Sequence, residues 1–307
     1  MILDENVVDS IHEVGGTILG SSRGQQDPKL MVETLMRMDI NMLFCIGGDG
    51  TLKSAHLIAE EVKRRQLNIS VIGIPKTIDN DISYMDRTFG FETAIYATNP
   101  VITVAHNEAK GAVNGIGLVH VMGRDSGFIA AYAALANTHI NYCLVPEEKF
   151  TLEDGPNALL PSLLKRLQTR HHAVIIVAEG AGQDLIAGER QTDKSGNILN
   201  QNVGIYLKER IQAYAKERNF ELNVKYFDPT YMIRGIPANG TDAVFCLLLA
   251  QNAVHAAMSG RTDMVIGHWS DTFTHVPIAI ATSKRKKIDP TGTLWRSVRM
   301  NTWPVYP

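Results

Sequence analysis

Residues 69–81, ISVIGIPKTIDND, pass from an apolar run directly into a lysine and two aspartates. A short apolar run that ends at a proline is typical of a buried strand in a parallel sheet. Lys76, Asp79 and Asp81 then lie where this strand leaves the sheet. Charged groups at this density beside a buried strand indicate a binding or catalytic site.

The same pattern recurs along the chain, because apolar strand-like segments alternate with segments of helical periodicity. Strands are predicted at 40–46, 68–74, 114–122, 142–148, 172–180, 222–228 and 263–269, and helices at 51–65, 126–137, 156–170 and 203–218. This alternation predicts βαβ crossovers, and therefore an α/β fold with mainly parallel sheets. Such sheets bind ligands at the carboxyl ends of their strands. Polar clusters follow three of the predicted strands, at 47–51, 75–81 and 123–127.

The first of these clusters lies in CIGGDGTLKSA (45–55), which joins a predicted strand to a predicted helix. Glycines let the backbone turn tightly, and a helix N-terminus offers free N–H groups to a phosphate. Asp49 in this position favours Mg²⁺, which is usually held by one or two carboxylates together with substrate phosphates. The GxxxxGK[ST] pattern of a P-loop is absent. A plain glycine turn with an aspartate at the helix start is the alternative.

The second cluster contains two aspartates that are separated by one residue. In an extended segment, Asp79 and Asp81 project to the same side and Asn80 projects to the other. Two neighbouring carboxylates suit a division of roles, in which one acts as a base while the other orients a ligand or binds a metal. Thr77 adds a hydroxyl to the same side. A surface loop capped by Asx turns is the alternative.

Several cations lie in or near the other polar segments. Arg23 and Arg124 are suited to bidentate contacts with phosphate oxygens, and Lys225 and Arg234 flank the segment YFDPTYMI. Glu179 ends a very apolar predicted strand, where a carboxylate often binds hydroxyl groups. Taken singly, each of these cations is more typical of an exposed surface charge. Together they indicate a pocket for a sugar phosphate or a nucleotide.

Bulk composition excludes several classes of protein. The 307 residues carry a net charge of −2, are 20% charged and 45% hydrophobic, and so predict about two soluble globular domains without the basic footprint of a nucleic-acid binder. Three widely spaced cysteines predict free thiols in a reducing compartment. The first ten residues do not resemble a secretory signal. Residues 243–258 are apolar but too short to span a bilayer, which predicts a buried helix, a cytoplasmic protein and no membrane partner.

A set of motifs now becomes recognisable in order and spacing: GGTILGSSRG (15–24), IGGDGT (46–51), PKTIDND (75–81), VMGRDSG (121–127), AEG (178–180) and DPTYMIRG (228–235). Together they resemble the 6-phosphofructokinase family. The resemblance covers nearly the whole chain. It is nearest to the branch that plant and trypanosomatid ATP-dependent enzymes share with long pyrophosphate-dependent enzymes.

The resemblance implies a role for each motif residue. Asp79 would remove the proton from the 1-hydroxyl of fructose 6-phosphate, Asp49 would hold Mg²⁺, and Asp81 would support both. Lys76 and Arg124 complete the implied catalytic set. The implied contacts of fructose 6-phosphate are Thr77, Ile78, Asp79, Met122, Gly123, Arg124, Glu179, Lys225, Tyr231 and Arg234. The implied contacts of the phosphoryl donor are Arg23, Gly24, Gly48, Asp49, Gly50 and Thr51.

The resemblance also implies an architecture of two Rossmann-like, three-layer α/β/α domains. Residues 1–91 with 235–294 would form the phosphoryl-donor domain, and residues 92–234 with 295–307 the sugar-phosphate domain. A homo-oligomer, dimeric or tetrameric, is expected. The sequence departs from the family at its start, because the family begins with a strand and a GGDxPGxN-type loop that precede the point matched by Met1. We therefore expect this chain by itself to bind ATP weakly.

Two residues bear on the choice of donor and point in different directions. A glycine after GGD, here Gly50, leaves room for the α-phosphate of ATP, whereas an aspartate would exclude it. Lys76 is typical of pyrophosphate users, although plant-like ATP users carry it too. Steric exclusion is the harder constraint, so ATP with Mg²⁺ is the prediction. A pyrophosphate-dependent transferase and a non-catalytic regulatory subunit that binds sugar phosphate remain as alternatives.

Overall fold

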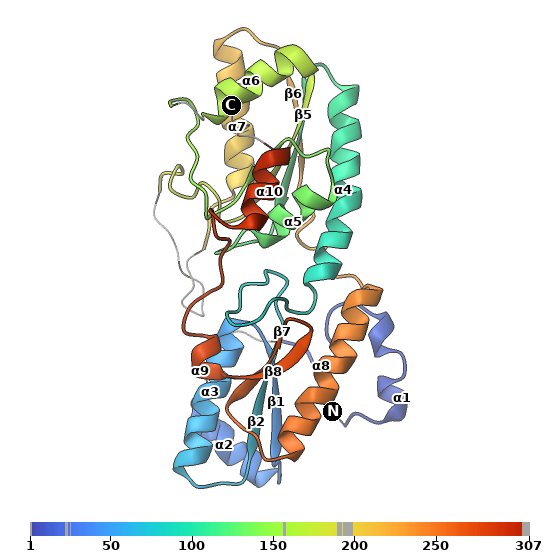
Figure 1. Cartoon of the computed structure of the whole chain (residues 1–307), viewed down its shortest axis with the longest axis vertical. Helices are drawn as coiled ribbons and strands as arrows, with labels where there is room; N and C mark the ends of the chain where they lie inside the picture. The colour runs from blue at the N-terminus through green and yellow to red at the C-terminus, as the bar shows by residue number, and fades with distance from the viewer. Residues whose placement is uncertain are drawn as a thin grey trace. The chain divides into compact units, whose positions relative to one another are not determined.

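A computed structural model describes residues 2–21, 24, 26–155, 158–188, 192 and 199–302. The chain divides into two compact units, Met1–Thr93 with Ile236–Lys286 and Ala94–Gly235 with Lys287–Pro307 (Figure 1). In the described residues, each unit is built around one four-stranded sheet. Helices cover both faces of each sheet, so the architecture is the α/β class that the sequence predicted.

The sheet of the first unit has the strand order β1-β2-β7-β8. Strands β1, β2 and β7 are parallel, and β8 joins β7 in an antiparallel hairpin. The elements of this unit are α1 (Glu5–Val8), the 3₁₀ helix η1 (Ile11–Glu13), α2 (Pro28–Arg37), β1 (Met42–Gly47), α3 (Asp49–Arg64), β2 (Ser70–Pro75), α8 (Gly240–Met258), β7 (Met264–Trp269), β8 (Thr272–Pro277) and α9 (Ile278–Ala281).

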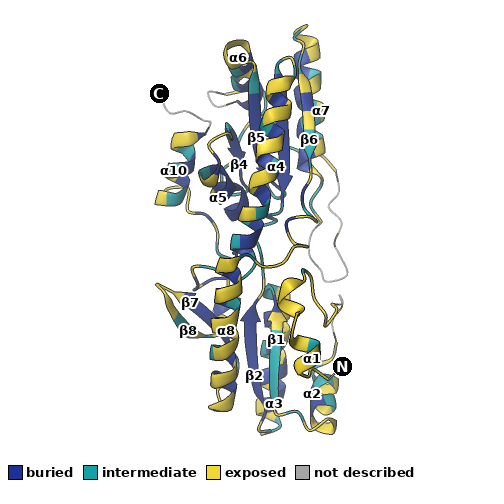
Figure 2. Cartoon of the chain, turned by 90° about the vertical axis from the view of Figure 1, so that its right-hand side faces the viewer, coloured by how far each residue is buried: buried dark blue, intermediate teal, exposed yellow. Residues whose placement is uncertain are grey.

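Two apolar clusters hold this sheet between its helices. On one face, Leu52 of α3 packs with Val71 of β2, and on the other, Phe245 of α8 packs with Ile72. Figure 1 shows α3 and α8 on opposite sides of the sheet. All of β2 is buried, whereas most of β1, at the edge of the sheet, is partly exposed (Figure 2). The site residues that follow β2 therefore start from a rigid, fully packed strand.

Helix α8 differs from the buried helix that the sequence predicted. By length and composition alone α8 could cross a membrane, yet only 33% of its most apolar window is buried in the structure. Val244, Leu247 and Met258 are 62%, 61% and 69% exposed, and Figure 2 shows a largely exposed outer side. The prediction of a buried helix is therefore right for one face and wrong for the other, because uniform apolarity does not reveal which side meets the sheet.

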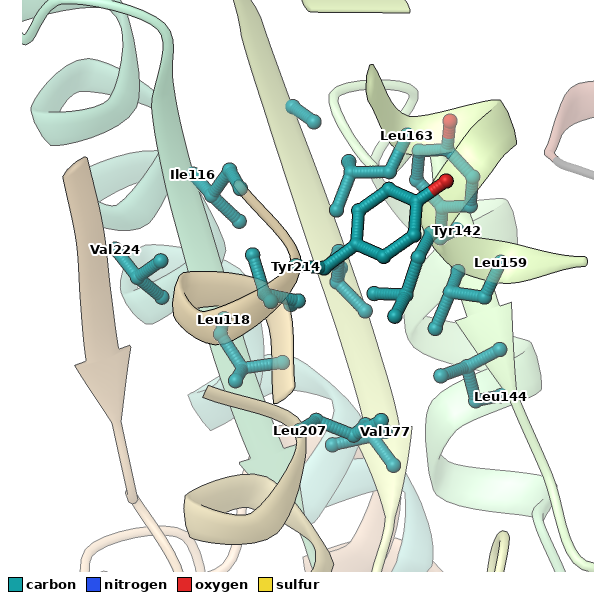
Figure 3. Packing of buried hydrophobic residues seen from close by; sticks show 14 of the residues in the cluster. Ile116, Leu118, Tyr142, Leu144, Leu159, Leu163, Val177, Leu207, Tyr214 and Val224 are labelled. Carbon is teal, nitrogen blue, oxygen red and sulfur yellow. The ribbon is translucent and has the colours of Figure 1, made fainter. Parts of the chain in front are cut away.

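The sheet of the second unit is parallel throughout, in the order β4-β5-β3-β6. Its core includes Leu118 and Val177 from the central strands, and Tyr142, Leu207 and Tyr214 from neighbouring elements (Figure 3). The elements of this unit are α4 (Phe91–Gly111, with its first turn in the other unit), β3 (Gly115–Val121), α5 (Phe128–Ala136), β4 (Tyr142–Leu144), α6 (Leu159–Arg170), β5 (His172–Ala178), α7 (Val203–Glu217), β6 (Asn223–Phe227) and α10 (Thr293–Asn301).

Local capping explains where several helices begin. Asp27 accepts a hydrogen bond from the backbone N–H of Lys29, and Pro28 takes the first helical position of α2. Asn202 caps α7 and Asn239 caps α8 in the same manner, through the N–H group three residues later. These caps compensate for the N–H groups that lack partners in the first turn of a helix.

Helix α4 was not predicted, because Pro100 interrupts the helical signal in its sequence. It packs unusually close to β3, where the strand has glycines at 115 and 117. A Cβ atom on Gly117 would lie 2.5 Å from the carbonyl oxygen of Ala105, and one on Gly115 would lie 2.1 Å from that of Ala109. The two glycines therefore let a helix backbone rest directly on a strand.

The three cysteines are free, as predicted. Cys143 is buried, while Cys45 and Cys246 are partly buried. Burial raises the pKa of Cys45 and of Cys246 to about 11 and raises that of Cys143 further, so all three thiols are protonated at neutral pH.

Substitution of Gly117 by alanine should destabilise the second unit by about 1–3 kcal/mol, because a methyl group in this contact overpacks the interface of α4 and β3. Gly111→Ala is the matched control, since its Cβ meets nothing within 4 Å and its φ is not positive. Urea unfolding followed by circular dichroism measures both variants. Equal stability of Gly117→Ala and the parent would contradict the close approach of strand and helix.

Candidate active site

The two charged motifs of the first unit lie side by side at one edge of its sheet. In the register of β1 and β2, Gly47 pairs with Pro75, the last residue of each strand. The backbone N–H of Lys76 donates to the carbonyl of Gly47 at 2.9 Å. The parallel pairing therefore brings the segments 47–51 and 75–81 together, as the sequence analysis expected.

An arginine that the sequence analysis did not select lies between two of the predicted acidic residues. Arg285 Nη1 is 2.6 Å from Asp81 Oδ2, and Arg285 Nη2 is 3.8 Å from Asp49 Oδ2. Asp81 is 5% exposed. Asp49 also contacts Lys53 one turn along α3, at 2.9 Å. The carboxylates of Asp49 and Asp81 therefore face a common cation.

The segment from Thr77 to Asp81 forms a turn, so the same-side projection of Asp79 and Asp81 that an extended segment would give does not follow. Asn80 has φ 53°, in the left-handed region. The Thr77 hydroxyl accepts a hydrogen bond from the backbone N–H of Asp79 at 3.1 Å and donates to Asp81 Oδ1 at 3.3 Å. Thr88 donates to the carbonyl of Thr77 at 2.6 Å. Thr77 therefore contributes hydrogen bonds at both ends of the turn, which the alternation of side chains along an extended strand could not predict.

The remaining predicted donor residues lie at the start of α3 or near it. Gly48 is the N-cap of α3, and Asp49, Gly50 and Thr51 form its first turn. A Cβ atom on Gly50 would meet nothing within 4 Å. Lys76 is exposed, and a Cβ atom on Gly90 would lie 3.1 Å from Cγ2 of Ile78. Gly24 is exposed with φ 131°, and Arg23 lies outside the described residues.

The second unit gathers another predicted group at the ends of β3 and β5. The backbone N–H of Glu179 donates to Val121, and that of Gly180 donates to Gly123, each at 2.9 Å. Gly123 has φ 134°, and a Cβ on Gly180 would lie 2.0 Å from the carbonyl oxygen of Arg124. Met122, Gly123, Arg124 and Glu179 therefore share one edge of this sheet. Asn200 donates to the Glu179 carboxylate at 3.4 Å.

The loop after β6 carries Tyr231 and Arg234, and its first residue anchors it. Asp228 Oδ1 accepts a hydrogen bond from the backbone N–H of Thr230 at 3.1 Å. Asp228 Oδ2 lies 3.5 Å from Nδ1 of the buried His120. Tyr231 is 78% exposed, and the Arg234 guanidinium lies 4.7 Å from the centre of its ring. The loop therefore presents an aromatic ring and a cation together.

Lys225 lies apart from this group along its strand. In the register of β3 and β6 it pairs with Gly117, well before the carboxyl end of β3. Its Nζ is 4.0 Å from Glu108 Oε2. The structure does not bring Lys225 to the edge that holds Arg124 and Glu179, so its contact with a sugar phosphate stays a prediction.

Sequence reasoning also missed Glu147, which supports the loop that precedes α5. Both of its carboxylate oxygens accept from the backbone N–H of Gly127 at 3.1 Å, and Oε1 also accepts from Ile288 at 3.0 Å. Gly127, the N-cap of α5, has no side chain, so Glu147 supplies the cap from elsewhere in the chain. Its position at the end of the predicted strand 142–148 was the available signal.

The acidic residues present fit Mg²⁺ in the role that the sequence analysis gave it. In the described part of the chain, no three His, Cys, Asp or Glu side chains cluster as an all-protein metal site. Mg²⁺ usually needs only one or two carboxylates, together with waters and ligand phosphates. Asp49 supplies a carboxylate at a helix start, and its approach to Arg285 shows that this edge accommodates positive charge.

Comparison with known proteins supplies independent findings. The sequence matches the family model "Phosphofructokinase" over residues 1–257. It is 50% identical to an ATP-dependent 6-phosphofructokinase of Borreliella burgdorferi, across 98% of this chain and 68% of that protein. It is also 50% identical to an ATP-dependent 6-phosphofructokinase of Trypanosoma cruzi, across 97% of this chain and 61% of the relative. The resemblance read from the motifs is thereby confirmed.

A solved structure gives the same result for the fold. The pyrophosphate-dependent phosphofructokinase of Marinobacter aquaeolei aligns with a TM-score of 0.74, at 20% identity, over 94% of this chain and 71% of that one. An identity this low supports the fold alone, and the predicted phosphofructokinase-like α/β architecture is confirmed. This chain spans about two thirds of the length of the two relatives named above.

Glu147→Gln should destabilise the second unit by about 1–3 kcal/mol, because the amide nitrogen that replaces Oε2 cannot accept from the N–H of Gly127, and the remaining neutral oxygen is a weaker acceptor than a carboxylate. Glu148→Gln is the control, since the neighbouring Glu148 makes a long contact of 3.8 Å with Arg299. Burial raises the pKa of Glu147, so the carboxyl group of Glu147 binds a proton more tightly in the native state than in the unfolded state.

The pH dependence of the same variant has a definite sign. As the pH falls from neutral towards the ordinary glutamate pKa of about 4.3, the parent should gain stability relative to Glu147→Gln, which does not titrate. Urea unfolding at several pH values measures the difference. A difference in unfolding free energy that stays constant with pH would contradict the raised pKa.

Proposed function

The chain belongs to the phosphofructokinase family, and we propose that it transfers the γ-phosphoryl group of ATP to the 1-hydroxyl of fructose 6-phosphate. The products are fructose 1,6-bisphosphate and ADP. The single observation that supports this best is the turn from Thr77 to Asp81, held at the end of a buried strand beside Asp49. The names of the relatives support ATP as the donor.

In this proposal, Asp79 acts as the base. Its carboxylate accepts the proton of the 1-hydroxyl, the freed oxygen forms a bond with the γ-phosphorus, and the bond from that phosphorus to the bridging oxygen of ADP breaks. Thr77 holds the backbone of Asp79, so the carboxylate is positioned before the substrate binds. Phosphoryl transfer depends mainly on positioning and on charge stabilisation, and this turn contributes the first.

Charge stabilisation comes from several groups. Asp49 would hold Mg²⁺, which supplies positive charge to the donor phosphates when bound. The N–H groups of the first turn of α3, at Gly50 and Thr51, suit phosphate oxygens. Lys76 and Arg124 would neutralise charge on the transferred group. We propose that Asp81, held by Arg285, supports both the base and the metal ligand.

We further propose that the first unit is the phosphoryl-donor domain and the second is the sugar-phosphate domain. Glu179 would bind sugar hydroxyls, and Arg234 with Tyr231 would bind the 6-phosphate side of fructose 6-phosphate. Met122 and Gly123 bring the backbone close to the sugar. A cytoplasmic homo-oligomer, dimeric or tetrameric, fits the family, and its subunit number is open to measurement by light scattering.

A pyrophosphate-dependent transferase is the second candidate. Lys76 favours it, because an exposed cation at the end of β2 suits a leaving phosphate. Gly50 favours ATP, because the space beside its Cα is open. A regulatory subunit that binds sugar phosphate without turnover is the third candidate. The presence of both carboxylates, Asp49 and Asp79, argues against it, because a subunit without turnover does not need them.

Asp79→Ser should lower the turnover number by about 10²–10⁴-fold, the usual contribution of a general base. Binding of fructose 6-phosphate should change little, because its phosphate is held by other residues. Coupled-enzyme kinetics and calorimetry measure the two quantities. Glu60→Gln is the control, since it removes an exposed carboxylate from α3 of the same unit. A turnover number near that of the parent would remove Asp79 from this role.

Gly50→Asp should shift the donor preference from ATP towards pyrophosphate. A carboxylate there repels the α-phosphate of ATP, and pyrophosphate has no group in that place. Gly50→Asn is the matched control, because it has the same size without the charge. Rates with both donors are compared for the three chains. An unchanged preference would contradict this placement of the donor. If the parent chain turned over with neither ATP nor pyrophosphate, that result would contradict the proposed function.

A further inference from the structure

Lys286 is a partly buried lysine whose Nζ donates three hydrogen bonds to one loop. Its Nζ donates to Asn80 Oδ1 at 3.0 Å, to the carbonyl of Met85 at 3.0 Å and to the carbonyl of Asp86 at 3.1 Å. Asn80 Nδ2 donates in turn to the same Asp86 carbonyl at 3.1 Å. We propose that Lys286 is a positioning residue, which holds the turn carrying Asp79 and Asp81 in its reactive shape.

The backbone around Lys286 reinforces this contact. Its N–H donates to the carbonyl of Asp81 at 2.8 Å, and Ile82 and Arg285 form an antiparallel bridge. Ser83 Oγ donates to the carbonyl of Lys284 at 2.7 Å. A segment some 200 residues away in the sequence is therefore paired with residues 81–83, where the turn ends, and Lys286 extends that pairing to the Asn80 side chain.

The turn needs such support because of its conformation. Asn80 has φ 53°, which side-chain-bearing residues adopt rarely, and asparagine more often than most. Residues held in such regions persist only where their surroundings determine them. Lys286 meets this need, since it binds the side chain of the left-handed residue and the backbone five and six residues later.

The environment of Lys286 argues against direct contact with a ligand. The three hydrogen bonds named above match the three N–H donors of an ammonium group. Burial lowers the pKa of Lys286 to about 8, against the opposing pull of Asp86 and Asp81. A lysine that meets phosphate would be expected to keep donors available for it. Lys286 thus acts through the turn, whereas its neighbour Arg285 contacts the Asp81 carboxylate itself.

Hydrogen exchange followed by mass spectrometry tests the positioning role without requiring turnover. In Lys286→Met, which keeps the length and removes the donors, amides of 77–88 should exchange at least about tenfold faster than in the parent. Peptides from β3 should be unchanged. Lys284→Met is the matched control, because the Lys284 side chain is exposed and only its carbonyl is used. Parental exchange in 77–88 would overturn the proposal.

Kinetics tests the catalytic consequence, which rests on the proposed function. Lys286→Met should lower kcat by about 10–100-fold, while KM for fructose 6-phosphate changes by less than about twofold. Asn80→Gly removes the acceptor and tolerates the positive φ, so its effect on kcat should be less than additive with that of Lys286→Met. A parental kcat in Lys286→Met, or additive effects, would overturn this part.

Two further outcomes keep the two hypotheses separate. Absence of phosphoryl transfer by the parent chain would count against the proposed function, while the exchange measurement would still decide the role of Lys286. If Lys286→Met fails to fold, Asn80→Gly takes its place in the exchange experiment. Faster exchange of 77–88 in Asn80→Gly supports the proposal, and unchanged exchange contradicts it.

Discussion

Parallel pairing of buried strands is the constraint on which the candidate site residues of each unit depend. In the first unit, the last residues of β1 and β2 are paired, so the glycine-rich segment and the aspartate turn leave the sheet together. In the second, Val121 and Ala178 are paired, which joins Gly123 and Arg124 to Glu179. Rigid apolar strands thereby fix the starting points of loops that carry little apolar surface of their own.

Charge in the first unit is balanced locally before any ligand arrives. Asp81 is buried against Arg285, and a buried carboxylate without a partner would be costly. Asp49 is held by Lys53 and approached by Arg285. A metal ion at Asp49 would therefore replace a positively charged side chain beside this carboxylate. Such a replacement limits the rearrangement that metal binding requires.

Much of this arrangement could be predicted from the sequence, and the failures have identifiable causes. Apolar periodicity located the parallel strands, and strand ends located Asp49, Asp79, Gly123 and Glu179, because these signals are local. Arg285 and Lys286 were missed because their partners lie about 200 residues away, and a basic run such as KRKK looks like solvated surface. The left-handed Asn80 was missed because alternation assumes an extended chain. Pro100 concealed α4, and uniform apolarity concealed the exposed side of α8.

The features that the sequence did not predict share a physical origin, and this origin concerns how a site on an irregular turn is held in shape. Strand and helix signals report where the backbone is regular, whereas a catalytic turn is irregular and must be held by contacts from elsewhere. Here the segment from Lys284 to Lys286 returns from α9 and pairs with the residues that follow Asp81. In the proposed site, one loop carries the reactive groups and contacts from another loop hold its shape. A substitution in the second loop can therefore impair the reaction without touching the substrate.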